Sequence, residues 1–552
     1  MCGIWAVFGS DEDVSVQCNA VHKITHRGPD AFRIENINHF QNCCLGFHRL
    51  AIVDDVKGMQ PMRLYTHPHI WLIYNGEIYN YKTVAQENKF HLSTDCDGEP
   101  IIHLYAKYGI DFPAHLDGVF AFCLFDTANR KVFIGRDTFG VRPSFKLVTD
   151  SGFLAVCSEA KGLFGLSHSL TDEQANIIPV TPGTVEQYDL DNNGRATFRE
   201  RKQFHSIGDM PMYKTPVDID SLGDDVKENI RMLFETAVQK RLMADRRIGC
   251  LLSGGLDSSL VAALLVKNAK EQKLPYRIQT FSIGMEGSTD IIASRKVAKH
   301  LNTDHHEIIF TPEEAIDVLD ELIRHLETYD ITTIRASIGM YLVSKYISEK
   351  TDTVVILSGE GSDELAQGYI YFHKSPSPEA GDEESRRLLK DLYMYDVLRG
   401  DRSTAAWGLE IRVPFLDHQF TSYYLSLPAE DRVPRKGVEK YLLRSAFDGM
   451  NLLPKDILWR PKEAFSDGVS AVKRSLFEVI QDFCDQQIND DQLEQSVSLY
   501  PFNTPRTKEA LYYRRVFEKY YPSKSSWIPY MWMPRWINAT DPSARTLKHY
   551  KQ

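Results

Sequence analysis

The alternation of buried strands with helix-length segments, from about residue 200 onward, is the feature that most restricts the fold of this chain. The segments IGCLL, IQTFSIG, HHEIIF and TVVIL are apolar and of strand length, and helix-length segments separate them. Ahead of the first of them, apolar residues recur at helical spacing, at Val226, Ile230, Leu233, Ala237 and Val238. The alternation predicts an α/β domain with a mostly parallel sheet that helices cover on both faces.

The first two hundred residues have a different pattern, in which short strands and turns follow one another. CLGFHRLAIVD, HIWLIYNGEIY and VFAFCLFDTANRKVFIGRD contain apolar, β-branched and aromatic runs of strand length. The DTANR turn in the last of these predicts a hairpin, and residues 94 to 108 have the spacing of a helix. We therefore expect antiparallel sheets in this half of the chain.

The length of 552 residues favours two domains, since single cores seldom grow much beyond ~250 to 300 residues. Residues 201–222 carry turn residues and little periodicity, so we interpret them as a linker. The predicted domains are residues 2–200 and residues 223–552.

Composition and charge exclude several classes of function. The net charge of −11 argues against general nucleic-acid binding, because a phosphate backbone selects basic surfaces. No apolar run approaches the ~18 residues of a membrane span, and MCGIWAVFGSDED lacks the basic region of a signal peptide. The nine cysteines are an odd number without paired metal-ligand spacing, which is typical of free thiols in a reducing cytosol. We expect a cytoplasmic protein with no membrane and no nucleic-acid partner.

Cys2 directly follows the initiator methionine, so removal of Met1 would leave one residue with both a thiol and a free α-amine. An α-amine titrates near ~7.7 to 8.0 and can relay a proton to and from the sulfur. The alternative, on position alone, is an ordinary buried cysteine near a terminus. Cys2 is therefore a candidate nucleophile that carries its own base.

LLSGGLDSS at 251–259 places two glycines and several hydroxyls between a predicted strand and a predicted helix. Backbone N–H groups at a helix N-terminus form a cradle suited to pyrophosphate. A tight strand-to-helix turn is the alternative for a bare glycine pair. No GxxxxGK[ST] motif occurs, so the phosphate-binding lysine of kinases and GTPases is absent.

SGEGSDE at 358–364 is a second candidate site, because it follows the apolar strand TVVIL. Glycines and acids at the carboxyl end of a parallel strand suit a metal and nucleotide site, where open parallel sheets usually bind ligands. A solvated acidic loop is the alternative.

Three segments of the first half, MCGIWAVFG, HRGPD at 26–30 and YNGEIYN at 74–80, together resemble the class II glutamine amidotransferases. The resemblance covers roughly residues 2 to 200. It implies an α+β N-terminal-nucleophile sandwich, in which two antiparallel sheets lie between helices. It also implies that Cys2 forms a glutamyl thioester and releases ammonia.

The same resemblance implies roles for the residues around Cys2. The Asn75 amide and the Gly76 N–H would stabilise the oxyanion of the tetrahedral intermediate. Arg49 would bind the α-carboxylate of glutamine. Glu77, together with an acid of TDCDGE, would bind the α-ammonium group of glutamine. Asp97 fits the family pattern better than Asp95 does. The implied glutamine-binding set is Arg49, Leu50, Ala51, Ile52, Val53, Asn75, Gly76, Glu77 and Asp97.

The SGGLDS string resembles the pyrophosphate loop of the N-type ATP pyrophosphatases, which favours cleavage of ATP to AMP and pyrophosphate. With ETYDITTIRAS, GLEIRVPFLDH and RPKEAFSDG, both active-site motifs resemble the asparagine synthetase family, most closely its animal form, over almost the whole chain. The second domain is thus expected to have a PP-loop ATP pyrophosphatase fold. β-Lactam synthetase shares both domain types but needs no ammonia, and a catalytically silent scaffold is a further alternative.

This second resemblance implies ATP as a substrate and Mg²⁺ as its metal. Asp257 and Asp363 would hold the Mg²⁺, whose hard oxygen preference matches carboxylates and phosphates. Glu360 would act near the acyl-adenylate, and Lys462 would neutralise charge during adenylation and ammonia attack. The implied ATP-binding set is Leu251, Ser253, Gly254, Gly255, Asp257, Ser258, Ile283, Ser358 and Gly359.

Thr332, Thr333 and Arg335 would face aspartate or the phosphates. Arg335 and Lys462 could instead form structural ion pairs. In GLEIRVPFLDH we expect an ordered charge network, with no direct chemistry for Glu410, Arg412 or Asp417.

The expected reaction has two halves. Attack of the aspartate β-carboxylate on the ATP α-phosphate would give β-aspartyl-AMP, and ammonia would then displace AMP to give asparagine. An internal passage is expected for the ammonia, because release into water would protonate most of it. A homodimer is one expected assembly, and the oligomeric state is otherwise open.

Overall fold

The computed structural model describes residues 1–10, 12–37, 40, 42–166, 176–462, 468–470, 474–539 and 541–542. The chain forms two compact units. Unit 1 contains residues 1–215, 243–246 and 405–410, and unit 2 contains residues 216–242, 247–404 and 411–552. The division at residues 215 and 216 falls within the segment that we interpreted as a linker, although strand β12 (Ala196–Gln203) extends into it.

Unit 1 contains two six-stranded sheets whose paired strands are antiparallel. One has the strand order β10-β8-β9-β1-β3-β2 and the other β12-β11-β7-β6-β5-β4. The first sheet contains β1 (Gly3–Phe8), β2 (Ala31–Asn36), β3 (Cys44–Arg49), β8 (Phe145–Val148), β9 (Leu154–Cys157) and β10 (Asn176–Pro179). The second contains β4 (Met62–Leu64), β5 (His67–Ile78), β6 (Gly118–Asp126), β7 (Lys131–Arg136), β11 (Thr184–Leu190) and β12.

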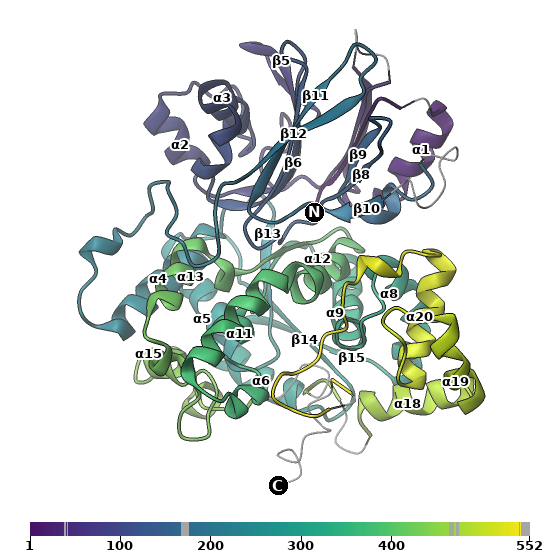
Figure 1. Ribbon diagram of the computed structural model, residues 1–552. Coiled ribbons are helices and arrows are strands. Elements are labelled where there is room, and N and C mark those ends of the chain that lie inside the picture. Colours follow the sequence, from purple (N-terminus) through teal and green to yellow (C-terminus); the bar gives the residue numbers. More distant parts are fainter. Residues whose placement is uncertain are drawn as a thin grey trace. The chain divides into compact units, whose positions relative to one another are not determined.

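Side chains that alternate along β5 build two separate cores. Ile73 belongs to a cluster with Ile4 and Phe47 of the other sheet, so the two sheets face each other. Leu72 and Tyr74 point to the opposite side, where they pack with residues of α2 (Tyr81–Asn88) and α3 (Glu99–Tyr108). Helix α1 (Val14–His22) lies on the other side of the unit (Figure 1). The predicted sandwich of antiparallel sheets between helices is confirmed.

Two local predictions have different outcomes in unit 1. The DTANR hairpin is confirmed, because β6 and β7 pair antiparallel on either side of it. The helix predicted for residues 94–108 begins only at Glu99. The Glu99 carboxylate accepts hydrogen bonds from the backbone and hydroxyl groups of Ser93 and Thr94, which stabilises a turn ahead of the helix.

Unit 2 is built on a sheet with the order β15-β14-β13-β16-β17. Its first four strands pair parallel to their neighbours. These strands are β13 (Arg247–Leu251), β14 (Gln279–Gly284), β15 (Asp304–Ile309), β16 (Thr353–Leu357) and β17 (Glu410–Arg412). The four predicted strands correspond to β13 through β16, so the mostly parallel sheet is confirmed.

Helices alternate with these strands and extend beyond them (Figure 1). Those between β12 and β17 are α4 (Val226–Lys240), α5 (Leu256–Glu271), α6 (Thr289–Leu301), α7 (Pro312–Asp317), α8 (Leu319–Leu326), α9 (Ile331–Lys350), α10 (Ser362–Leu365), α11 (Pro378–Asp391) and α12 (Asp396–Ala405). After β17 come α13 (His418–Ser426), α14 (Ala429–Arg432), α15 (Tyr441–Phe447), α16 (Lys455–Leu458), α18 (Leu476–Gln487), α19 (Asp490–Leu499) and α20 (Lys508–Tyr520). Within the described residues, no helix is long and apolar enough to cross a membrane.

Candidate active sites

Cys2 lies immediately before β1 in unit 1, and its Sγ atom is 3.4 Å from both the backbone N and the backbone O of Leu50. Arg27 Nε donates a hydrogen bond of 3.0 Å to the Cys2 carbonyl. Burial raises the pKa of the Cys2 thiol to about 11, and the carboxylate charges of Glu410 and Glu77 add to the rise. A thiol with this pKa needs a base to become nucleophilic.

Met1 is fully buried, and its terminal amine donates a 3.2 Å hydrogen bond to the Leu409 carbonyl within unit 1. Burial lowers the pKa of this amine to about 5. The Cys2 nitrogen is a peptide amide in this form of the chain, so it cannot accept the thiol proton as an amine would.

Asn75 and Gly76 lie on β5, opposite Ala121 and Phe120 of β6. The Asn75 side chain is fully buried, and neither its amide nitrogen nor its amide oxygen has a hydrogen-bond partner among the described residues. A buried amide without a partner is costly, and it is the kind of group that an oxyanion could bind. Gly76 has a φ of +147°, and a Cβ atom there would lie 2.0 Å from the Val119 carbonyl oxygen. Only glycine fits this position.

The structure separates the two acids of TDCDGE. Asp97 is buried, and its carboxylate accepts hydrogen bonds of 2.7 Å from the Tyr74 hydroxyl and from the backbone N–H of Ile78. Both donors flank the Asn75–Glu77 segment. Asp95 is exposed. Asp97 is therefore the acid that lies against the predicted glutamine site.

Arg49 and the residues after it follow the end of β3. The Arg49 guanidinium donates hydrogen bonds to the backbone carbonyls of Asp54 and Asp55, so in this structure loop carbonyls are among its partners. Leu50, Ala51 and Ile52 are buried, Val53 is half-buried, and Glu77 is buried on β5.

The SGGLDSS loop joins β13 to α5, as its position between a strand and a helix predicted. Within the loop, the Ser253 and Ser258 hydroxyls are 3.0 Å apart, and the Gly255 N–H donates to the Ser253 oxygen at 3.3 Å. Gly254 has a φ of +75°, where a Cβ atom would lie 2.4 Å from the Ser294 nitrogen. The first N–H groups of α5 lack helical acceptors, and they can bind an anion.

A cavity brings the SGGLDSS and SGEGSDE motifs together in unit 2. Of the predicted residues, those that line it are Leu251, Ser253, Gly255, Asp257, Ser258, Ile283, Ser358, Gly359, Glu360, Asp363 and Lys462. Gly254 is absent from the lining and lies in the loop beside it.

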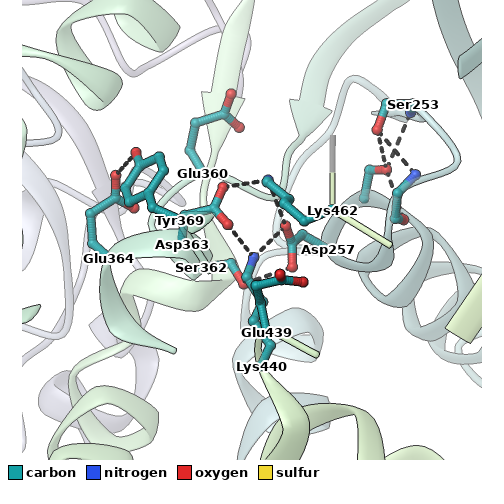
Figure 2. A network of polar contacts seen from close by, with 12 residues as sticks. Ser253, Asp257, Glu360, Ser362, Asp363, Glu364, Tyr369, Glu439, Lys440 and Lys462 are labelled. Carbon is teal, nitrogen blue, oxygen red and sulfur yellow. Dashed lines mark hydrogen bonds and ion pairs between the residues drawn. The ribbon is translucent and has the colours of Figure 1, made fainter. Parts of the chain in front are cut away.

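Two lysines bridge the two predicted metal-binding acids (Figure 2). Lys440 Nζ lies 2.6 Å from Asp257 Oδ2 and 2.6 Å from Asp363 Oδ1. Lys462 Nζ lies 2.6 Å from Asp363 Oδ2. Burial alone would raise the pKa of Asp363, but the two lysines hold it well below its usual range. Burial likewise opposes charge on Lys462, yet Asp363 and Asp257 raise its pKa.

The side chains available as metal ligands in the ATP cavity determine how a metal ion could bind there. Among the residues that the structure describes, no three His, Cys, Asp or Glu side chains converge in a metal-binding arrangement. Asp257 and Asp363 supply only carboxylates, and Mg²⁺ is typically held by one or two carboxylates together with substrate phosphates. The two acids therefore fit a Mg²⁺ ion that arrives with a nucleotide.

Glu360 belongs to the acidic SGEGSDE turn at 358–364. Its Oε2 atom accepts a hydrogen bond from the Ser358 hydroxyl, and its Oε1 atom lies 3.1 Å from an Arg399 nitrogen. Lys440 and Arg399 line the same cavity, and neither was predicted from the sequence. Neither belongs to a recognisable motif, so no local signal indicated them.

The three residues of ITTIR that we expected to face substrate lie in different surroundings. Thr332 and Thr333, at the start of α9, line a second and smaller cavity. The Arg335 guanidinium forms ion pairs with Glu509 at 2.7 Å through Nε and with Asp541 at 3.0 Å through a terminal nitrogen. Arg335 lines neither cavity, so its geometry matches the structural ion pair that we considered as the alternative. Of RPKEAFSDG, residues 463–467 lie outside the described part of the chain.

Comparison with known proteins gives matches to both units. The asparagine synthase family matches residues 229–381 and 374–539, and the glutamine amidotransferase domain family matches residues 1–183. The chain is 63% identical to the glutamine-hydrolysing asparagine synthetase of Gallus gallus and 59% identical to that of Homo sapiens. Each comparison covers 100% of this chain and 99% of the relative.

Among solved structures, the glutamine phosphoribosylpyrophosphate amidotransferase of B. subtilis matches with a TM-score of 0.32 at 14% identity. That match covers 56% of this chain and 91% of the other.

Proposed function

Because the chain belongs to the glutamine-hydrolysing asparagine synthetases, we propose that unit 1 releases ammonia from glutamine at Cys2 and that unit 2 activates aspartate with ATP. Enzymes of this family are ATP-dependent amidoligases with glutaminase activity, and glutamine, aspartate and ATP are their substrates.

In unit 1, the Cys2 thiolate would attack the side-chain carbonyl of glutamine, and the α-amine freed by removal of Met1 would take the thiol proton. The unpartnered Asn75 amide and the Gly76 N–H would stabilise the oxyanion that forms. The α-ammonium then returns the proton to the leaving nitrogen, so that the C–N bond breaks, ammonia departs and a thioester remains, which water hydrolyses to glutamate. Asp97 and Glu77 would bind the α-ammonium of glutamine, and Arg49 its α-carboxylate.

In unit 2, the aspartate β-carboxylate would attack the α-phosphate of ATP, and pyrophosphate would leave. The N-terminus of α5, Ser253 and Ser258 are positioned to bind the pyrophosphate. Lys462 and Lys440 would neutralise the charge that develops on the phosphates. Ammonia then attacks the β-aspartyl carbonyl, the bond to AMP breaks, and the proton lost by the nitrogen passes to a base, for which Glu360 is the candidate.

Mg²⁺ would bind to Asp257 and Asp363, which supply the carboxylate oxygens that it prefers. When bound, Mg²⁺ would neutralise phosphate charge. The Asp257 and Asp363 carboxylates hold lysine ammonium groups in this structure, which supports their suitability for a cation.

The observation that carries this proposal is that the two motifs, about a hundred residues apart, line one cavity, where Asp257 and Asp363 share the Lys440 ammonium. The proposed cytoplasmic location is supported by nine free cysteines, since reducing compartments keep thiols free. A homodimer stays a prediction, which light scattering on the purified protein would test.

A product assay tests the proposed function. The mature protein with glutamine, aspartate, ATP and Mg²⁺ should form asparagine, glutamate, AMP and pyrophosphate in equal amounts. Cys2→Ala should abolish glutamate formation while asparagine still forms from added ammonium chloride, because the nucleophile and the ATP site belong to different units. Formation of ADP and phosphate would contradict the adenylation route, and glutaminase activity in Cys2→Ala would remove Cys2 from the mechanism.

A further inference from the structure

The HRGPD motif at residues 26–30 lies against the nucleophile of unit 1, although none of its side chains takes part in the proposed reaction. Arg27 is fully buried, and its Nε atom donates a 3.0 Å hydrogen bond to the Cys2 carbonyl. Gly28 brings the backbone of the motif close to β3, because a Cβ atom there would lie 2.3 Å from the carbonyl carbon of His48. The motif therefore holds a buried cation directly against the residue that carries the thiol.

Cys2 becomes the first residue of the chain when Met1 is removed, as the proposed function requires. The first residues of a chain are poorly ordered unless other groups tie them down. The hydrogen bond from the Met1 amine to the Leu409 carbonyl is lost with Met1, whereas the contact of Arg27 with the Cys2 carbonyl does not involve Met1. The thiol and the α-amine both belong to Cys2, so an anchor on this residue places both reacting groups.

A buried glutamate, Glu159, binds another nitrogen of the same guanidinium. Glu159 is fully buried, and its Oε1 atom accepts a 2.6 Å hydrogen bond from a terminal nitrogen of Arg27. A guanidinium is a rigid plane whose N–H groups point in fixed directions. Because Glu159 holds one nitrogen of this plane, it also sets the direction in which the Nε–H group points toward Cys2.

The orientation of the Glu159 carboxylate is set by two further side chains. Lys161 Nζ lies 2.5 Å from its Oε2 atom, and His26 Nε2 lies 3.2 Å from Oε1 and 3.1 Å from Oε2. Burial lowers the pKa of His26, and the charges of Lys161 and Arg27 add to this effect, which Glu159 opposes. His26 is therefore neutral near pH 7, and the two cations, Lys161 and Arg27, take one carboxylate oxygen each.

The backbone next to Glu159 is joined to the strand that begins after Cys2. Strand β9 pairs antiparallel with β1. Beyond the end of β9, the Ser158 N–H donates to the Ile4 carbonyl, and the Ile4 N–H donates to Ser158 Oγ, each at 3.0 Å. Glu159 follows Ser158 directly, so its place relative to Cys2 is fixed through the backbone as well as through Arg27.

We propose that Glu159 is a positioning residue for the glutaminase reaction, which orients Arg27 so that Arg27 anchors the N-terminal Cys2 through its carbonyl. The proposal rests on the proposed function of unit 1. Glu159 acts through Arg27 and contacts neither the Cys2 thiol nor the proposed glutamine-binding groups in any of the hydrogen bonds and ion pairs given above. Covalent attack requires reacting atoms ~3 to 3.5 Å apart and correctly aligned, so a poorly anchored Cys2 would react more slowly with glutamine that is bound normally.

The test compares glutamine hydrolysis by full-length mature variants. Glu159→Gln keeps the shape of the side chain and removes its charge, whereas Glu159→Asp keeps the charge on a shorter side chain. Glu186→Gln is the matched control. Glu186 is also fully buried in unit 1 and also binds two cations, but these are Lys146 and Arg201, and it lies on β11 of the other sheet.

We expect Glu159→Gln to lower kcat for glutamine hydrolysis about 10- to 100-fold, as a misplacement of about 1 Å at a reacting group can do. The KM for glutamine should stay nearly unchanged. Glu159→Asp should have a kcat between those of Glu159→Gln and the wild type, also at an unchanged KM, and it carries the test if Glu159→Gln does not fold. Glu186→Gln should keep the wild-type values of both constants. Synthesis from ammonium chloride and the thermal unfolding midpoint show whether each variant is folded.

A double variant tests the route through Arg27. Arg27→Met should lower kcat at least as much as Glu159→Gln does. Adding Glu159→Gln to Arg27→Met should cause no further loss, because residues that act as one unit are not additive.

A wild-type kcat in Glu159→Gln would overturn the proposal. An equal loss in Glu186→Gln would also overturn it, because the effect would then follow from the loss of any buried acid in unit 1. A raised KM for glutamine at an unchanged kcat would place Glu159 in glutamine binding instead, and a further loss in the double variant would exclude the route through Arg27. Failure of the wild type to form glutamate would overturn the proposed function itself, which is a separate outcome.

Discussion

Lys440 Nζ lies 2.6 Å from Asp257 Oδ2, although 183 positions separate the two residues in the chain. The same ammonium group contacts Asp363, so one buried lysine holds the two acids that we propose as metal ligands. Without it, Lys462 alone would offset the repulsion between the two carboxylates.

Lys440→Met should therefore lower the rate of asparagine synthesis by about 100-fold or more with either nitrogen source, as loss of one charge-stabilising group typically does. Glutaminase activity should be unaffected. Steady-state assays of both half-reactions check this, with Lys436→Met as control, because Lys436 is exposed in the preceding turn. A normal rate from ammonium chloride in Lys440→Met would contradict the role of Lys440.

A residue that remains attached before Cys2 should abolish glutaminase activity. The Met1 amine donates to Leu409, and the Cys2 nitrogen is an amide that cannot serve as base. An uncleavable extension should spare synthesis from ammonium chloride, because the SGGLDSS loop is unchanged. Intact-mass measurement alongside both assays decides the matter, and full glutaminase activity in protein that retains Met1 would refute the N-terminal-amine mechanism.

Asp97→Asn should raise the KM for glutamine about 10- to 100-fold, since a hydrogen bond to a charged group contributes ~1.5 to 3 kcal/mol. Asp95→Asn should leave this KM nearly unchanged, because Asp95 is exposed whereas Asp97 is buried beside Asn75. Glutaminase kinetics on both variants make the comparison, with ammonia-dependent synthesis as the measure of folding. A larger effect from Asp95 would reverse the assignment.

Arg335→Met should lower the stability of the protein and should leave its affinity for substrates nearly unchanged. The change leaves Glu509, which is fully buried, without its cation, and breaking a buried ion pair typically costs about 3 to 5 kcal/mol. Thermal unfolding should show this loss, while the KM values for aspartate and ATP of the folded enzyme stay nearly unchanged. A normal unfolding midpoint with a raised aspartate KM would instead place Arg335 at the substrate.

Stability should fall as the pH decreases from about 6.5 to 4 because of His48 in unit 1. Burial lowers the pKa of His48 to about 4, and its Nε2 atom lies 3.0 Å from the Val21 carbonyl. Between these pH values the unfolded chain, with a histidine pKa near ~6.5, binds a proton that the folded chain excludes. The neutral His48 side chain thus stabilises the folded chain above this pH window. This contribution to stability is lost as the pH falls through the window.

His48→Gln should therefore lose less stability than the wild type between pH 7 and pH 4. The difference has an upper limit of about 3 kcal/mol. Thermal unfolding midpoints at a series of pH values measure it, and parallel curves for the two proteins would exclude His48 as the cause.

Much of the fold could be predicted from short segments, because residues close together in the chain determine where strands and turns form. The continuous apolar run along β5 is typical of a strand that is buried on both faces, because successive side chains point to opposite sides of the sheet. The turn between β6 and β7 and the loop between β13 and α5 were also predictable, because strand length and glycine or turn residues set them. The start of α3 was predicted too early, because Glu99 bonds to Ser93 and Thr94 and so favours a turn before the helix.

The sequence by itself determined four strands of the parallel sheet in unit 2, several strands of unit 1 and the two motifs that line the ATP cavity, because periodicity and turn chemistry act over a few residues. Only the tertiary structure decided which charged side chains meet. Lys440 reaches Asp257 and Asp363, Arg335 is bound by Glu509 and Asp541, and Arg27 is bound by Glu159, through contacts between segments far apart in the chain. A buried charge is stable only with a partner within a few ångströms, and the packing of helices on the sheet sets that distance.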